Sequence, residues 1–180
     1  ECTQYYFYVE STDPAANTAM DNNSGSYYTF KTVKNTQPTY TNTTQVPIPD
    51  SNTTGASSVI SVPDDKVISD VNVTVNITHT YDGDLEIHLI APDNTDIILS
   101  NNRGGSGDNF TDTVFDDEAS TAIASGAAPF TGSFIPDQAL STFDTMSGLG
   151  DWTLKVIDSA GGDTGTIDSW SIEFTFPAGV

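Results

Sequence analysis

The chain has 180 residues, with five Lys or Arg against 25 Asp or Glu, and a formal net charge of −20 at pH 7. This charge repels nucleic acid and anionic membrane surfaces, so we expect neither as a partner. The length allows one substantial core and a small second module, and no apolar run or leader-like segment predicts a membrane span or a targeting signal. A solvated acidic coat explains much of the charge, so only local clusters of Asp support a metal site.

Residues 1–33 predict a β-hairpin of two aromatic strands, 5–10 and 26–33, joined by a loop rich in Asp and Asn. The run TQYYFYVESTDPAANTA and the later YYTFKT resemble the last strands of a fibronectin type III or immunoglobulin-like module, which implies a truncated remnant. Because an isolated hairpin is marginal in water, we expect it to pack on the second domain or to belong to a neighbouring module. Cys2, the sole cysteine, excludes an internal disulfide and indicates either a chain cut from a longer protein or a free buried thiol.

Residues 34–43 contain mainly Thr, Asn and Gln and are predicted to be a linker, so a second domain would span 44–180. Its first strands are expected from Gln45 and around residues 59–62, where Pro63 ends the second one. Residues 71–77 and 85–90 then alternate apolar and polar side chains, which predicts two half-buried strands around a Tyr-Asp-Gly-Asp turn.

Further strands are predicted at 97–99, 113–115, 132–135, 152–158 and 169–176, with one or two helical turns within 136–143. In the last strand Trp170, Ile172 and Phe174 fall on one face, and Trp152 with Leu154 offers a matching apolar face. Many short strands separated by turn signals indicate an all-β sandwich.

Three segments, GDLEIHLIAPDNTDIILS, FTGSFIPDQALSTF and GDWTLKVIDSAGGDTGTIDSWSIEFTF, together resemble the P domain that follows the catalytic domain of proprotein convertases and many secreted bacterial proteases. The resemblance covers residues 44–176. It implies an all-β, jelly-roll-like β-sandwich with no active site of its own, acting beside a protease in the same polypeptide. It also implies an extracellular location.

The residues offer little material for catalysis, because there are two histidines and neither a Gly-x-Ser-x-Gly elbow nor a His-Glu-x-x-His helix. His79 lies just before the Gly-Asp-Leu turn, and we expect it to hydrogen-bond that loop rather than to act as a base. We therefore predict no catalytic residues.

Carboxylates are more informative, because calcium needs several oxygen ligands converging over a short stretch of backbone. Their common use in turns is to accept backbone hydrogen bonds, which is the alternative interpretation. Because like charges this close repel, we expect at least one structural calcium site. The predicted ligands form three clusters: Asp82 and Asp84; Asp108, Asp112, Asp116 and Asp117; and Asp158, Asp163 and Asp168.

The predicted function is that of a non-catalytic P domain of a secreted, subtilisin-like serine endopeptidase. It would contact the catalytic domain in cis and stabilise the protease, or assist its folding, secretion or engagement of the protein substrate. It would be a monomer. The alternative is a module that binds carbohydrate or an extracellular polymer, which would need a row of exposed aromatic rings. Independent hydrolase activity is a third hypothesis, which intact casein and ester substrates would exclude.

Overall fold

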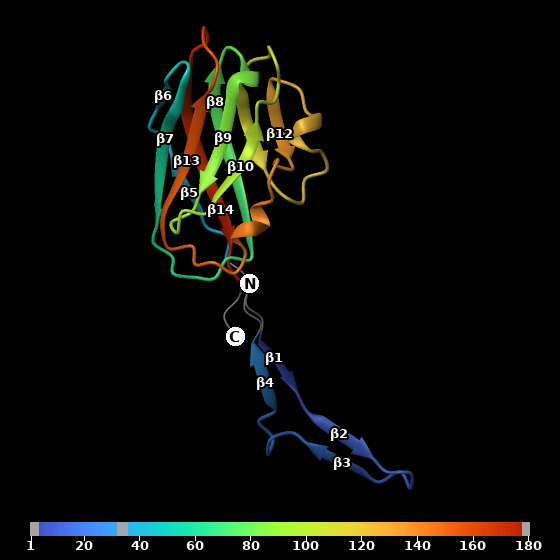
Figure 1. The fold of residues 1–180 in the computed structure, drawn as a ribbon. Coiled ribbons are helices and arrows are strands. Elements are labelled where there is room, and N and C mark those ends of the chain that lie inside the picture. The colour runs from blue at the N-terminus through green and yellow to red at the C-terminus, as the bar shows by residue number, and fades with distance from the viewer. Residues whose placement is uncertain (1–3, 32–35, 178–180) are drawn as a thin grey trace. The chain divides into compact units, whose positions relative to one another are not determined.

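A computed structural model describes residues 4–31 and 36–177 (Figure 1). The chain divides into two compact units, residues 1–35 with 177–180 and residues 36–176. No helix in the described ranges is both long and apolar enough to cross a membrane. The described elements are β1 (Gln4–Phe7), β2 (Val9–Thr12), β3 (Thr18–Asp21), β4 (Tyr28–Lys31), β5 (Thr39–Asn42), β6 (Val46–Ile48), β7 (Asn52–Val62), β8 (Asp70–His79), β9 (Leu85–Ile90), β10 (Asp96–Asn101), β11 (Phe110–Phe115), β12 (Phe130–Phe134), β13 (Gly150–Asp158) and β14 (Gly165–Thr175), with 3₁₀ helices η1 (Asp82–Asp84), η2 (Ile123–Ser125) and η3 (Leu140–Phe143).

The first unit contains the predicted hairpin, but its strands are interrupted. β1 pairs with β4, and β2 pairs with β3, both antiparallel. β4 lies within the predicted second strand, whereas β3 forms from residues that were predicted to be loop. Asn23, Ser24 and Tyr27, between β3 and β4, have positive φ angles, a conformation that does not continue a ladder. The last two residues of the predicted 26–33 strand lie outside the described residues.

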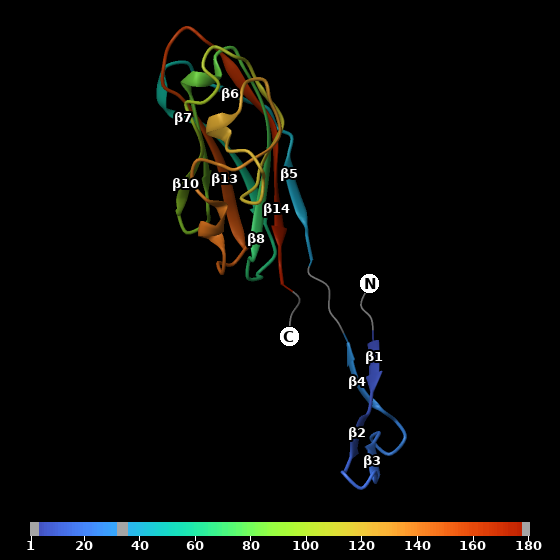
Figure 2. The same ribbon diagram turned by 90° about the vertical axis from the view of Figure 1, so that its right-hand side faces the viewer.

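The second unit is a β-sandwich, which confirms the predicted fold class (Figure 2). One sheet has the order β10-β9-β13-β7. The other has the order β12-β11-β8-β14-β5, and β6 also pairs with β14. All pairs are antiparallel except β11 with β12. The strand around residues 59–62 was predicted too short, since β7 begins at Asn52.

The prediction of a linker at 34–43 is wrong for residues 39–42, which form β5 at the edge of the larger sheet. Tyr40 explains this, because its ring packs 6.3 Å from that of Phe174 and its hydroxyl donates to the Asp64 carboxylate. That hydrogen bond and the loss of solvation raise the pKa of Tyr40 to about 12, burial being the larger cause. A single anchored aromatic ring thus holds a segment that its composition presents as a loop.

The core lies between the two sheets and uses the predicted faces. Trp170, Ile172 and Phe174 are fully buried, as are Trp152 and Leu154. Burying such side chains contributes about 1.5–3 kcal/mol each. The two indole groups are also satisfied: Trp170 Nε1 donates to Ser58 Oγ at 3.0 Å, and Trp152 Nε1 donates to the Gly148 carbonyl at 2.9 Å. The predicted helical turn within 136–143 is the 3₁₀ helix η3.

Candidate functional site

The sandwich separates the predicted metal ligands. β8 and β11 are antiparallel, so the end of β8 and the end of β11 lie at opposite ends of the larger sheet. Asp82 and Asp84 follow β8, and Asp158 ends β13 near them. Asp116 and Asp117 follow β11 and belong to the opposite end. The predicted ligands therefore lie at both ends of the sandwich.

Asp82 is a fully buried carboxyl group in a glycine-rich enclosure. The loop 102–109 folds around η1: the Asp82 amide donates to the Gly107 carbonyl at 2.8 Å, and the Gly83 amide to the Gly105 carbonyl at 2.9 Å. A Cβ atom at Gly83 would lie 2.9 Å from the backbone of Gly105, so this approach requires glycine. Asp82 Oδ1 accepts a hydrogen bond from the Asn109 amide at 2.9 Å, whereas Oδ2 is buried without a partner.

This environment makes the Asp82 carboxyl group unusually basic. Burial raises its pKa from 3.8 to about 7, the nearby charge of Asp108 adds to the increase, and the hydrogen bond from Asn109 opposes it. A carboxylate oxygen buried without a donor is costly, so the group either keeps a proton near neutral pH or needs a cation.

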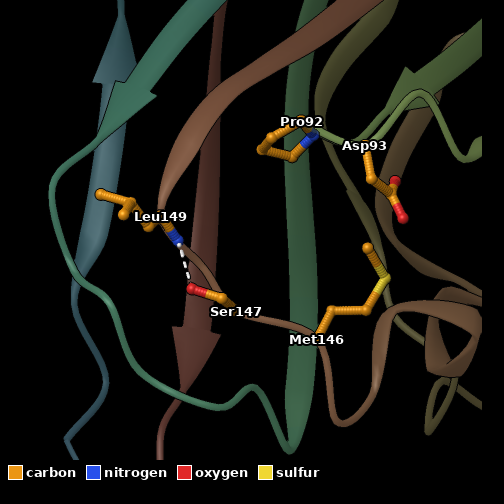
Figure 3. A pocket seen from close by; sticks show the side chains of 5 residues that line it. All are labelled: Pro92, Asp93, Met146, Ser147 and Leu149. Carbon is orange, nitrogen blue, oxygen red and sulfur yellow. Dashed lines mark hydrogen bonds between the residues drawn. The ribbon is translucent and has the colours of Figure 1, made fainter.

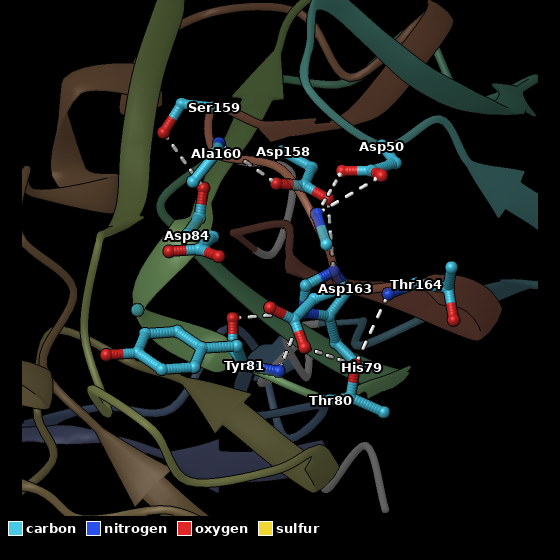
Figure 4. Close-up of polar contacts among 12 residues, drawn as sticks. Asp50, His79, Thr80, Tyr81, Asp84, Asp158, Ser159, Ala160, Asp163 and Thr164 are labelled. Carbon is cyan, nitrogen blue, oxygen red and sulfur yellow. Dashed lines mark hydrogen bonds and ion pairs between the residues drawn. The ribbon is translucent and has the colours of Figure 1, made fainter.

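A second set of carboxylates lies where the loop before β14 meets the turn after β8 (Figure 4). Burial, and then the charges of Asp158, Asp163 and Asp50, raise the pKa of Asp84, while His79 lowers it. Asp50 was not among the predicted ligands. It comes from the turn between β6 and β7, and its only sequence signal was an Asp in a Pro-Asp-Ser turn. Both of its carboxylate oxygens accept the Gly162 amide, at 3.1 and 3.2 Å.

His79 is fully buried and links three segments of this end. Its Nδ1 lies 3.0 Å from the Tyr81 carbonyl, and its Nε2 lies 3.3 Å from Asp158 Oδ2. This confirms the prediction that His79 hydrogen-bonds the loop. Its ring also explains Gly165, because a Cβ atom there would lie 2.3 Å from His79 Cδ2 and 2.5 Å from the Thr78 carbonyl oxygen.

At the other end of the sandwich, the carboxylates of Asp116 and Asp117 accept hydrogen bonds from backbone amides of neighbouring turns. Asp117 accepts the backbone amides of Leu140 and Ser141 at 2.9 and 2.8 Å, and so fixes η3 to the end of β11. Asp116 Oδ1 accepts the Glu118 amide at 2.7 Å. The structure also brings Asp70 and Asp144, which were not predicted, to this end: burial and then the charges of Asp70 and Asp117 raise the pKa of Asp144.

The remaining predicted ligands lie elsewhere. Asp168 is on β14, where its two oxygens accept from Gln45 Nε2 at 3.1 Å and Thr78 Oγ1 at 2.7 Å. Asp112 on β11 accepts from Asn76 Nδ2 at 3.1 Å. These side chains have hydrogen-bonding roles in the sheet, and their assignment as calcium ligands stays a prediction.

Within residues 4–31 and 36–177, no three His, Cys, Asp or Glu side chains converge closely enough to hold a metal ion by themselves. Calcium takes six to eight oxygen ligands and accepts backbone carbonyls and water. The unpartnered Asp82 Oδ2 in a glycine-rich loop fits this chemistry, with Asp108 as its charged neighbour. The set around Asp158 and Asp163 fits it less well, because Asp158 already contacts His79.

Neither histidine is arranged as a catalytic base. In the described residues, His79 contacts backbone and a carboxylate, and His88 contacts Asp96 at 2.9 Å and Glu86 at 3.6 Å. Neither imidazole has a hydroxyl partner, so a hydroxyl nucleophile and its base are not assembled here. Cys2 lies outside the described residues.

Figure 3 shows a hollow of about 330 Å³ on the surface of the second unit. It is lined by Pro92, Asp93, Met146, Ser147 and Leu149. Its lining is mainly apolar and holds a single carboxylate, so it supplies neither a metal site nor a catalytic group.

Exposed aromatic rings do not form a row on the sandwich. Phe110, Phe130 and Phe143 are buried, and among residues 36–177 the exposed ring is that of Tyr81, at 37%. The first unit is different, because Tyr5 stacks on Phe30 at 5.0 Å with both rings about half exposed.

The model of the family described as the proprotein convertase P-domain matches residues 68–174. The chain belongs to this family. The chain is 33% identical to leupeptin-inactivating enzyme 1 of Streptomyces exfoliatus over 178 residues, a match covering 94% of this chain and 35% of that protein. It is 35% identical to the transglutaminase-activating metalloprotease of Streptomyces mobaraensis, with 75% of this chain and 15% of that protein covered.

A calcium-dependent protease of Nostoc is 36% identical over 140 residues, covering 76% of this chain and 18% of that protein. The crystal structure of a serine protease of Aeromonas sobria has the same fold, with a TM-score of 0.56, 16% identity, and 96% of this chain and 37% of that chain covered. The chain thus spans about a third or less of these proteins. The comparisons associate the P domain with proteases and leave the fibronectin-like remnant as a prediction.

Proposed function

We propose that this P domain is a non-catalytic accessory domain of an exported peptidase, in which it stabilises the catalytic domain in cis. The observation that carries the proposal is a family fold with no assembled catalytic group, found within much longer protease relatives. The relatives include a metalloprotease by name, so the predicted serine-type class of the parent stays a prediction. Inhibition of the full gene product by a serine-directed or by a metal-chelating reagent tests that class.

Deletion of residues 36–176 from the full gene product should lower the thermal stability and the secreted yield of its peptidase, because the catalytic domain loses a folded partner. Unfolding and activity in the culture medium measure this. The isolated 180-residue chain should leave casein and ester substrates intact. Unchanged stability and yield after the deletion would exclude the accessory role.

We also propose a structural calcium ion at the end of the sandwich after β8, with Asp82 and Asp108 as its protein carboxylates. The support is the buried, unpartnered Asp82 Oδ2 together with the charge of the nearby Asp108 carboxylate. Asp84 belongs to the second set of carboxylates, and its assignment as a calcium ligand stays a prediction. Backbone carbonyls of the glycine-rich loop and water would complete the coordination. Calcium would then hold loop 102–109 against η1 and stabilise this end.

Calcium at about 100 times its dissociation constant should raise the unfolding free energy by about 2.7 kcal/mol and the midpoint by several degrees relative to chelated protein. Scanning calorimetry with and without chelation measures this. The matched control is Asp168→Asn, which removes a carboxylate from the sheet face and should retain the full response, whereas Asp108→Asn should reduce it. An unchanged midpoint in the wild-type protein would reject the calcium site and leave the carboxylates as a solvated acidic surface.

The predicted remnant of a fibronectin type III or immunoglobulin-like module is retained for the first unit. This interpretation is supported by the half-exposed aromatic rings of the two-stranded ribbon. A two-stranded ribbon by itself is only marginally stable in water, so these rings are suited to packing against further strands. The match covering 94% of the chain also reaches into residues 1–35.

We propose no separate carbohydrate-binding function, because the sandwich lacks the row of exposed rings that this function was expected to need.

A further inference from the structure

The outer face of the four-stranded sheet carries four aliphatic side chains that the core does not use, among polar and charged ones. The polar and charged outward residues include Ser57, Ser61, Glu86, His88, Asp96, Asp151, Thr153 and Lys155. Register places Val59, Thr153 and Ile90 side by side across β7, β13 and β9. Ile98 on β10 and Ile157 on β13 also point away from the core. Val59 is 45% exposed, and the three isoleucines are partly exposed. We call Val59, Ile90, Ile98, Ile157 and Lys155 the aliphatic face.

The outer face of the other sheet is built differently. Thr41, Ser171 and Thr74 are neighbours across β5, β14 and β8. Along the described strands β8, β11 and β14, the outward positions are mainly Thr, Ser, Asn and acidic residues, and Val114 is the aliphatic exception. Threonine satisfies the same β-branched strand preference as isoleucine and valine. Strand propensity therefore does not account for the aliphatic side chains of the smaller sheet.

Lys155 on β13 lies directly between His88 on β9 and Ser57 on β7, and its outward neighbours along β13 are Thr153 and Ile157. Two other cations in the described residues are paired: Lys66 lies 3.2 Å from Asp64, and Arg103 lies 2.7 Å from Asp137. Lys155 has no carboxylate within 4.0 Å among the described residues.

The acidic side chains nearest to Lys155 in the sheet are engaged elsewhere. On β9 and β10, Glu86 and Asp96 both approach the imidazole of His88, at 3.6 and 2.9 Å. In the part of the chain that the structure describes, the Lys155 ammonium group thus has no carboxylate partner on an outer face that also carries Val59, Ile90, Ile98 and Ile157. Such a surface complements an apolar patch that contains one carboxylate.

We propose that the aliphatic face is the surface on which the peptidase domain of the same polypeptide docks, with aliphatic side chains around an Asp or Glu that pairs with Lys155. The proposal rests on the accessory function given above and names the docking surface for it. A second copy of this chain is the poorer occupant, because a two-fold contact would bring two Lys155 ammonium groups and two strongly acidic proteins together.

Amine acetylation of Lys155 tests the docking surface directly. Its rate is measured by mass spectrometry in the isolated 180-residue chain and in the full gene product. We expect acetylation of Lys155 to be at least tenfold slower in the full protein. Lys66, 48% exposed by its side chain and located before β8, is the internal control and should change less than twofold. Equal rates at Lys155 in the two proteins would overturn the proposal.

A pair of double variants separates this proposal from the accessory function. In the full gene product, Val59→Ser with Lys155→Glu should lower the thermal stability of the peptidase as deletion of residues 36–176 does. The matched control, Val114→Thr with Thr41→Glu, changes the other sheet and should keep the wild-type stability. Wild-type stability in both double variants, together with a loss on deletion, would reject the aliphatic face and keep the accessory function, whereas unchanged stability after the deletion would reject both.

Discussion

Replacing Asp158 by Ala should lower the free energy of unfolding by about 3 kcal/mol, measured by urea denaturation in chelator. The carboxylate is fully buried, and both of its oxygens are used: Oδ2 contacts His79 Nε2 at 3.3 Å, and Oδ1 accepts the Ala160 amide at 3.2 Å. The substitution leaves a buried imidazole nitrogen and a backbone amide without this partner, and each such loss costs about 1–3 kcal/mol.

The matched control is Asp163→Ala in the same end of the sandwich. Asp163 is partly exposed, and its Oδ1 accepts a hydrogen bond from Thr80 Oγ1 at 2.9 Å. Its removal should cost less than about 1 kcal/mol, since water can replace the partner. If the Asp158 and Asp163 variants had equal free energies of unfolding, the buried contact between Asp158 and His79 would not stabilise the fold as predicted.

Without calcium, the stability of the wild-type protein should fall as the pH rises from about 4 to 7, and the Asp82→Asn variant should lack most of this fall. The unfolded carboxyl group loses its proton near 3.8, whereas burial keeps the folded group protonated until about 7. Between these values the folded state binds more protons, so raising the pH favours unfolding. Above about 7 both states are ionised and this contribution becomes constant.

The expected loss is about 4 kcal/mol at full titration, at about 1.4 kcal/mol for each tenfold difference in proton affinity. Chemical denaturation at several pH values in chelator measures it. The readout is the slope with pH, because the Asn amide group can lower absolute stability through an unsatisfied Nδ2. The control is Asp168→Asn, whose carboxylate is partly exposed on the sheet face, and this variant should keep the wild-type slope. If the unfolding free energies of the wild type and of Asp82→Asn changed in parallel with pH, the raised pKa assigned to Asp82 would be contradicted.

Local pattern was sufficient for much of the fold. Alternation along β8, β9 and β14 predicted which side chains enter the core, because successive residues of a strand point to opposite faces. The position of His79 before a tight turn was enough to predict its hydrogen bond to the loop.

Other features depended on contacts that sequence separation conceals. Residues 39–42 have the composition of a linker, and only pairing with β14 and the packing of Tyr40 make them a strand. Asp50 joins the carboxylates around Asp84 because the turn before β7 meets the loop after β13. The local sequence around Asp50 does not predict this contact between distant segments.

The sequence by itself determined the all-β class, the P-domain family and the core faces of the main strands, since these follow from residue periodicity and short motifs. The tertiary structure decided how each carboxylate is used. Asp117 and Asp82 are both Asp residues in turns, yet one accepts two backbone amides and the other keeps an unpartnered oxygen in a closed loop. That difference arises from burial and from donors far along the chain, and these exist only when the two sheets are packed together.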